Sequence, residues 1–358
     1  MFSAKLLTTL TILFAFMSTS CFAKADEVSD SKDLQTEISE YIDHHLLDTH
    51  SFDLFSYKNE SGEKIHVSFP LPVILWDEGV KVFLSSEFKH EEALANIENS
   101  YYKLYHGKIY VTDRLGTINY DQEGHATNTK PLDFSITKNV VFIFLVGLIM
   151  ILIFISLAKS YKTNQIPKGI GRALEPIVLY IRDDIAKPNI GEKHYAKFMG
   201  YLLTIFFFVW IVNLFGLTPL GVNVTNNIAV TFALALITYL ITTFSGNKNY
   251  WKHIFWMPGV PLPMKIILAP IELLGTIIKP FSLMIRLYAN ITAGHIVIMS
   301  IVGLMFVFKN LVGSSLSFSL AFLLALLELL VAAIQAYIFT MLSALYFGMA
   351  VEEHDDDH

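Results

Sequence analysis

The segment IKPFSLMIRLYANITAGHIVIMSIVGLMFV, residues 278–307, is long enough to cross a lipid bilayer and is almost wholly apolar after Lys279. Its first half nevertheless carries Arg286, Asn290 and His295. Arginine stays charged in proteins, and in the middle of a bilayer it costs about 2.5–3.5 kcal/mol on an insertion scale. One interpretation is an arginine that snorkels near a helix end. The other, which we favour, is a membrane helix that keeps a fixed charge for its function.

The composition of the whole chain also indicates an integral membrane protein. Of its 358 residues, 53% are hydrophobic and only 16% are charged, and the mean hydropathy is +0.49. In soluble domains, about a quarter of all residues are usually charged. No basic run is interleaved with aromatic residues, which argues against a nucleic-acid partner. The single cysteine, Cys21, excludes an intramolecular disulfide framework.

The first 25 residues read as a secretory signal peptide, with a short basic start, an apolar core and small residues before a cleavage point at Ala23 or Ala25. An uncleaved anchor and a lipoprotein acylated at Cys21 are two alternatives. All three place the next segment, residues 26–135, outside the cytoplasm. This segment is polar, and its strand-like alternation predicts a small α+β or partly ordered unit.

The fold class predicted for residues 136–350 is an all-α polytopic membrane domain. A basic cluster after the first apolar run marks the cytoplasmic side. The tail, 351–358, is then cytoplasmic as well. The predicted spans are 139–158, 198–217, 226–245, 281–309 and 316–350, and the basic cluster is Lys159, Lys162, Lys168 and Arg172.

Two amphipathic segments lie between these spans. Residues 169–186 are too charged to cross the bilayer and are expected at the cytoplasmic surface. Residues 258–281 contain several prolines and are expected as an interfacial segment that leads into the next helix. The last two apolar runs exceed the thickness of the hydrocarbon core, so they are predicted to form a strongly tilted antiparallel hairpin.

Polar residues in that hairpin fall into two predicted layers. Residues at equal depth in an antiparallel pair have a constant sum of residue numbers, which pairs Arg286 with Gln335 and His295 with Glu328. Histidine and a carboxylate inside a membrane are typical of a proton path. A fixed arginine cannot relay a proton, but it attracts a passing carboxylate and favours release of its proton.

The sequence around these residues resembles subunit a of F-type ATP synthases. The matching stretches are KPFSLMIRLYANITAGH, LLVAAIQAYIFTMLSALYFGMAVEEH, FFFVWIVNLFGLTP and, ahead of the first span, HHLLDTHSFDL. The resemblance covers residues 139–354 almost continuously. Residues 56–130 have no counterpart in short members of the family, and the resemblance implies nothing about their role.

The resemblance implies roles for individual residues. Arg286 matches the essential arginine that faces the ring of c subunits, with Asn290 and Gln335 as polar neighbours. His295 and Glu328 occupy two positions where many bacterial members have glutamate first and histidine second, so the pair is exchanged here. Two further polar residues match the family along the proton path: Glu272 and Asn213. Gly216 stands where some bacterial members carry an acid.

The implied function is a stator with two proton half-channels that couples proton movement to rotation of the ring and to ATP synthesis. The implied partners are the c ring, the b subunits of the peripheral stalk, the F1 sector indirectly and the lipid of the inner membrane. No G-x-x-x-x-G-K-[ST] loop is present, so no nucleotide site, catalytic site of its own or cofactor is expected. The rivals are an ion-coupled secondary transporter, which usually shows paired halves, and a membrane-anchored receptor.

The stretch DHHLLDTH offers possible metal ligands in His44, His45, Asp48 and His50. Clustered polar residues on an exposed helix are commoner than a metal site, so no metal is predicted. The choice between proton and sodium depends on the ring, which this sequence does not contain.

Overall fold

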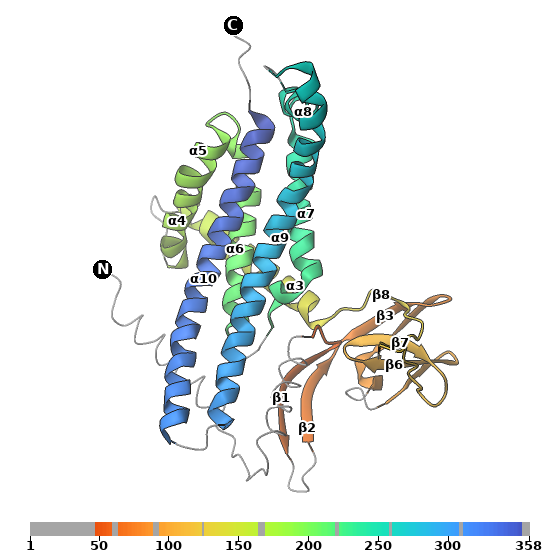
Figure 1. The fold of residues 1–358 in the computed structure, drawn as a ribbon. Helices are drawn as coiled ribbons and strands as arrows, with labels where there is room; N and C mark the ends of the chain where they lie inside the picture. The colour runs from red at the N-terminus through yellow and green to blue at the C-terminus, as the bar shows by residue number, and fades with distance from the viewer. Residues whose placement is uncertain are drawn as a thin grey trace.

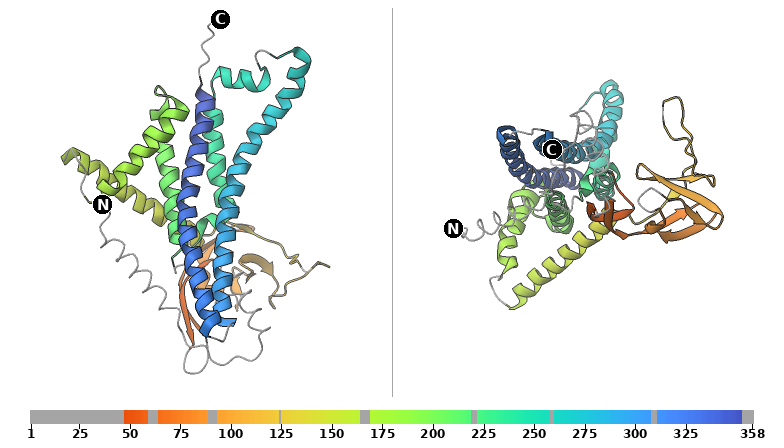
Figure 2. Two further views of the ribbon diagram at one scale, coloured as in Figure 1. Left: turned by 60° about the vertical axis from the view of Figure 1, so that its left-hand side comes forward. Right: turned by 90° about the horizontal axis from the view of Figure 1, so that it is seen from below.

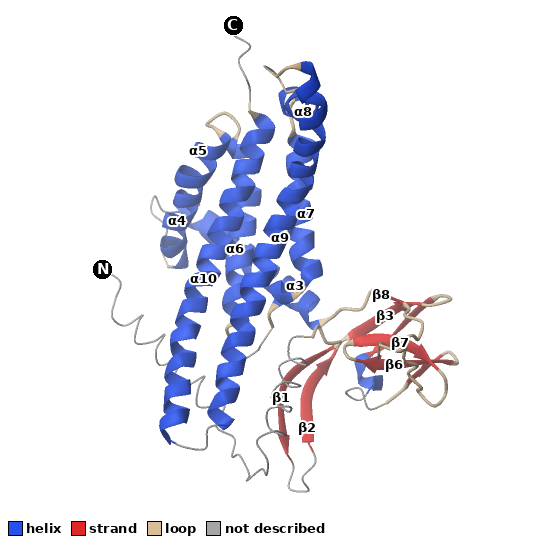
Figure 3. Ribbon diagram, viewed as in Figure 1, coloured by secondary structure: helices blue, strands red, loops and turns tan. Residues whose placement is uncertain are grey.

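The computed structural model describes residues 47–352, except 59–63, 89–92, 124, 164–168, 219–221, 258–259 and 308–310. A bundle of long helices carries a smaller β-rich part beside it (Figures 1 and 3). The strands all lie between residues 51 and 133, and the helical bundle follows them. The predicted class, a helical membrane domain with a small strand-containing extension, is confirmed. The signal peptide, Cys21, His44, His45 and the tail beyond residue 352 lie outside the described residues.

The β-rich part consists of three small antiparallel sheets. Strand β1 (Ser51–Lys58) pairs with β2 (Lys64–Pro70). A second sheet has the order β4 (Val80–Leu84), β3 (Pro72–Trp76), β8 (Leu132–Asp133), and a third the order β5 (Ala95–Ile97), β6 (Ser100–Tyr105), β7 (Lys108–Thr112), with the short helix η1 (Ser85–Phe88) between them. Alternate side chains point into one small core, as period-2 strands require. That core is built on Val73, Leu75, Phe88, Tyr102 and Leu104.

The first long helix, α3 (Lys138–Thr163), starts five residues after β8 ends. It is followed by α4 (Ile170–Tyr180), the π-helical turn η2 (Ile181–Ala186) and α5 (Lys187–Ile190). This region was predicted to be an amphipathic surface segment. One of its faces is apolar and buried, and the other is charged and exposed. Ile181 and Ile185 are fully buried, whereas Arg182 and Asp183 are exposed and form an ion pair 2.7 Å long.

The core of the bundle forms where α6 (Tyr195–Gly216) and α7 (Ile228–Ser245) pack against the last two helices. Between α6 and α7 lies the short helix η3 (Val224–Asn226). Apolar side chains from α3, η2, α5, α6, η3, α7, α9 and α10 meet in this core, which positions the polar residues described below. Its fully or almost fully buried members include Phe142, Ile181, Leu202, Val209, Leu283, Leu287, Phe339 and Phe347.

After the short helix α8 (Lys248–Phe255), two very long helices complete the chain: α9 (Leu262–Val307) and α10 (Leu311–Val351). Their lower parts run side by side in Figure 1 and in the left view of Figure 2, where the first part of α9 leans away from α10. At 1.5 Å per residue, α9 is about 69 Å long and α10 about 62 Å. Gly348 of α10 comes so close to α5 that a Cβ there would overlap the carbonyl oxygen of Asn189.

The interfacial segment expected before residue 281 is different in the structure. Helix α9 runs without a break through Pro270 and Pro280. Each proline removes one backbone donor but has a helical φ, and such prolines are tolerated in membrane helices. The proline-rich stretch therefore extends the helix instead of interrupting it.

Five of the described helices are long and apolar enough to cross a membrane: Lys138–Tyr161, Tyr195–Gly216, Ile228–Ser245, Leu262–Met305 and Val312–Val351. Each overlaps one of the five predicted spans.

Candidate functional site

The polar residues of α9 and α10 meet in the middle of the long hairpin. Asn290 donates from Nδ2 to Oε1 of Gln335 at 3.0 Å, and Gln335 is 2% exposed. The sequence placed Gln335 at the same depth as Arg286, and in the structure Gln335 bonds to Asn290, one helical turn further along α9. Arg286 and Asn290 are four residues apart and share a face of α9. The polar layer therefore exists, with the amide of Asn290 as its hydrogen-bond donor.

Glu328 forms the second polar position on α10. It is 5% exposed, and its Oε1 atom lies 3.2 Å from where a Cβ on Gly294 would stand. Within the described part of the chain, its Oε2 atom has no hydrogen-bond partner. Gly294 therefore provides the space for the carboxyl group, directly beside the half-buried His295 in the sequence.

The other side of α9 makes polar contacts with the loop before α7. The hydroxyl group of Thr292 donates a short hydrogen bond to Oδ1 of Asn226. Thr292 precedes His295 by three residues, about one helical turn. Lys138, at the start of α3, is also close enough to act electrostatically on His295. Two elements besides α9 and α10, η3 and α3, thus reach the surroundings of this histidine.

Arg286 lies half-buried at the α9–α10 interface, where its charge acts on the phenol of Tyr346. Tyr346 also lies beneath Lys279, whose Nζ is 5.5 Å from the ring centroid. Glu272 lies two turns before Lys279 and exerts an electrostatic effect on it. Charged residues therefore continue along α9 from the arginine toward α8.

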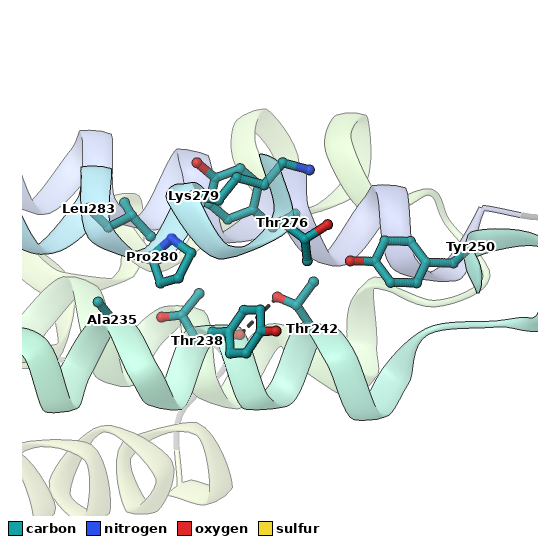
Figure 4. A pocket seen from close by; sticks show the side chains of 10 residues that line it. Ala235, Thr238, Thr242, Tyr250, Thr276, Lys279, Pro280 and Leu283 are labelled. Carbon is teal, nitrogen blue, oxygen red and sulfur yellow. Dashed lines mark hydrogen bonds between the residues drawn. The ribbon is translucent and has the colours of Figure 1, made fainter. Parts of the chain in front are cut away.

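A small pocket opens at this α8 end of the hairpin (Figure 4). Its volume is about 10 Å³, which is just enough for one water molecule. The phenol oxygen of Tyr250 points toward the hydroxyl group of Thr276, and Lys279 lies along the same wall. This pocket was not predicted, because its lining comes from four helices and no local pattern marks it.

Asn213 lies at the opposite end of the bundle, near the end of α6. It is 3% exposed and accepts a hydrogen bond of 2.8 Å from the hydroxyl group of Thr225, which also donates to Asn223 at 3.1 Å. In the described residues its Nδ2 atom has no partner. Gly216 lets Asn223 approach, since a Cβ there would be 3.4 Å from the side-chain amide carbon. The polar run NVTNN was the only sequence signal for Asn223 and Thr225.

The β-rich part is fastened to the bundle by Asp48. Its Oδ2 accepts hydrogen bonds from Thr137 Oγ1 at 3.0 Å and Asn227 Nδ2 at 3.1 Å, and its Oδ1 accepts one from the backbone of Asn139 at 3.3 Å. The backbone of Lys138 donates to Thr49 at 3.1 Å. These bonds join residues 48–50, the segment just before β1, to the starts of α3 and α7. We call this segment the stem.

His50, also in this stem, is 3% exposed and lies 2.8 Å from Asp133 Oδ2 through Nε2. Burial alone would raise the pKa of Asp133. Hydrogen bonds with His50 and Ser135 outweigh it, so the pKa lies below its usual value of 3.8. Asp48 and His50, considered above as metal ligands, thus make separate contacts. Among the described residues no three His, Cys, Asp or Glu side chains gather as a metal site would require.

Comparison with known proteins adds two family matches. A family described as "ATP synthase A chain" matches residues 140–348, and a "Domain of unknown function (DUF8433)" matches residues 41–134. The first therefore covers the helical bundle, and the second covers the β-rich part with Asp48, His50 and Asp133.

Three curated relatives are similar to this chain. "ATP synthase subunit a 2" of Chlorobaculum tepidum is 46% identical over 235 residues, which are 63% of this chain and 66% of the relative, just under two thirds. "ATP synthase subunit a" of Chloroherpeton thalassium is 42% identical over 268 residues, 68% of this chain and 80% of the relative. "ATP synthase subunit a" of Myxococcus xanthus is 41% identical over 63% of this chain and 77% of the relative.

Proposed function

Because this chain belongs to the ATP synthase A chain family, we propose that it is the stationary membrane subunit that passes protons to and from a rotating ring of c subunits. The observation that carries the proposal is the arrangement on α9 and α10. A fixed cation, Arg286, lies on the same helix as a histidine whose neighbour Gly294 faces the carboxyl group of Glu328.

Each residue has a distinct part in this mechanism. Protons reach Glu328 and His295 through a half-channel and are transferred to a carboxylate of the neighbouring ring. Once neutral, that group can face lipid while the ring turns. When it returns to Arg286 from the other side, the positive charge favours its ionised form, so the proton is released into a second half-channel. The hydrogen bond between Asn290 and Gln335 holds the two helices in register beside the arginine.

The two polar ends of the bundle suit the two half-channels. Asn213 and Thr225 lie at the end near the β-rich part, toward Thr292 and His295. Glu272, Lys279 and the pocket at Tyr250 lie at the other end. Arg286 separates them, which prevents direct passage of cations from one to the other.

The proposed topology places the β-rich part outside the cytoplasm and the C-terminus inside. Support comes from the signal-like start of the chain and from the basic cluster that follows the first span. The c ring and the b subunits of a peripheral stalk are the proposed partners, and F1 is an indirect one. The chain itself performs no chemistry on ATP, and ion-coupled secondary transport is the remaining alternative.

The test is ATP-driven proton pumping in inverted vesicles that contain the assembled complex. Arg286→Ala is expected to abolish pumping, and Arg286→Lys to fail largely, since a compact ammonium group does not replace a planar guanidinium. Lys265→Ala, on the same helix but stacked over Trp256 outside this region, is the control and should pump normally. Undiminished pumping by assembled Arg286→Ala complexes would refute the proposed mechanism. Independent transport by the purified chain without c subunits would favour the transporter.

A further inference from the structure

Asp48 itself lies outside residues 140–348, the part of the chain that the ATP synthase A chain family matches. That match begins at residue 140, whereas Asp48 belongs to the domain of unknown function. Its half-buried carboxyl group nevertheless joins two helices of the membrane bundle, through Thr137 and Asn139 at the start of α3 and Asn227 at the start of α7. The domain thus contributes a carboxyl group to the end of the bundle.

From Asp48 a series of polar contacts leads to the candidate site. Asn227 contacts Asp48, and the preceding residue, Asn226, accepts the hydrogen bond from Thr292. One turn further along α9 stands His295, and beside it Gly294 faces Glu328. Every step from the stem of the domain to Glu328 is therefore a polar contact, a sequence neighbour or a single helical turn.

We propose that the domain of unknown function forms part of the mouth of the proton path, and that Asp48 is the carboxylate that gathers protons there. This inference rests on the proposed function, and adds to it a role for a domain that the family match does not include. A carboxylate at a narrow entrance raises the local concentration of cations and so their rate of capture.

Several charged and polar groups surround Asp48 and bear on this role. Lys138 of α3 carries a positive charge near His295, which repels an incoming proton. The stem also carries His50, a second titratable group, which is paired with Asp133 of β8. α9 adds His295, while α7 and η3 face the mouth with the amides of Asn227 and Asn226. Of the carboxyl groups described at this junction, Asp48 is the one bonded to the bundle itself.

The experiment measures passive proton flux through the membrane sector of the complex. The membrane sector, purified without the soluble ATPase portion, is reconstituted into potassium-loaded vesicles with the β-rich part facing out. Potassium efflux makes the interior negative and drives protons inward, and the external pH is varied from weakly acidic to weakly alkaline. Asp48→Asn is expected to lower the flux by about tenfold at alkaline external pH, where protons are scarce, and little at acidic pH. Asp48→Glu keeps the charge and should stay within about twofold of the parent complex at every pH.

Two further variants separate charge from architecture. Asp121→Asn removes an exposed carboxylate in the same domain and should change nothing. Asn227→Ser preserves the cap of α7, because Ser and Asn cap helices about equally well, and removes the amide that donates to Asp48 while the Asp48 carboxylate stays. Its flux at alkaline pH should be at least that of the parent, even if Asp48→Asn fails to assemble.

The inference is overturned if Asp48→Asn conducts normally, or if it loses the same fraction of flux at every pH and Asp48→Glu is equally poor. Reduced alkaline flux in assembled Asn227→Ser would overturn it too, since only the bond to Asp48 is then lost. Glu328→Gln tests the proposed function separately. Normal flux in that variant contradicts the path itself, whereas blocked flux there with normal flux in Asp48→Asn rejects only the role of Asp48.

Discussion

Gly294 of α9 and Glu328 of α10 fit against each other so closely that the carboxyl oxygen occupies the space a side chain would need. A Cβ on Gly294 would lie 3.2 Å from Oε1 of Glu328. The position of this buried acid therefore depends on the absence of a side chain on the facing helix.

Gly294→Ala should shift the Glu328 carboxyl group by a few tenths of an ångström and lower passive proton flux by severalfold, and Gly294→Leu should abolish it. Misplacement of a proton-transfer group by about 1 Å can cost a hundredfold in rate. Gly275→Ala on the same helix is the matched control, since a Cβ there meets nothing within 4 Å. Equal flux in Gly294→Ala, Gly294→Leu and Gly275→Ala would show that this contact does not matter.

The second prediction concerns the exchanged pair. His295→Glu places two carboxyl groups together, and Glu328→His leaves two imidazoles and no acid, so each change alone should reduce passive proton flux. The double variant restores one acid and one imidazole in the opposite order, and should recover more flux than the two single effects allow. Losses that simply add, with the double variant below both single variants, would show that the residues act independently.

Gly348 should tolerate no side chain. A Cβ there would overlap the carbonyl oxygen of Asn189, and backbone atoms cannot move aside as a flexible side chain can. Overpacking in a well-packed interior typically costs about 1–3 kcal/mol, so Gly348→Ala should lower the melting temperature and the yield of the complex. Gly200→Ala, which meets nothing within 4 Å, is the control. A Gly348→Ala complex as stable as the parent would mean that α5 is not held there.

The link between the β-rich part and the bundle should weaken in acid. The pKa of Asp133 in the folded protein is lowered, so its contribution to stability is present above the unfolded value, about 3.8, and is lost as the pH falls through the folded value. Asp133→Asn should cost about 1 kcal/mol, toward the low end for a hydrogen bond to a charged group, because the side chain is 33% exposed. Hydrogen exchange of β8 and β3 would report the loss, and an unchanged acid dependence in Asp133→Asn would contradict it.

The long helices and their polar layers could be predicted from the sequence because both leave local signals. Apolar runs mark the helices, and Arg286, Glu328 and Gln335 stand out within them. The sequence did not predict the hydrogen bond between Gln335 and Asn290, because residue numbers give the depth of a Cα atom and not the reach of a side chain. The contacts of Asp48 with Asn227, and of Asn226 with Thr292, join loops far apart in the sequence. No periodicity records such pairs.

The prolines of α9 do not break the helix, contrary to what the sequence predicted. The proline-rich residues 258–281 were expected to form a broken interfacial segment, yet α9 continues through Pro270 and Pro280. In a membrane, a continuous helix satisfies the backbone hydrogen bonds that remain. The loss of one donor at a proline therefore does not end the helix.

The length of α9 has a consequence for the electrical field across the bilayer. A helix of about 69 Å stays within a hydrocarbon layer of about 30 Å only if its axis lies roughly 64° from the membrane normal. Arg286 and His295 are about 13.5 Å apart along that axis, so they differ by only about 6 Å in depth but by about 12 Å sideways. A potential of 100 mV, worth about 2.3 kcal/mol per charge over the full thickness, therefore separates their energies by only about a fifth of that amount. The two charges stand side by side in the field, and a proton that travels between them gains little from the voltage on that leg. Most of the voltage must therefore drop along the two stretches that connect Arg286 and His295 to water.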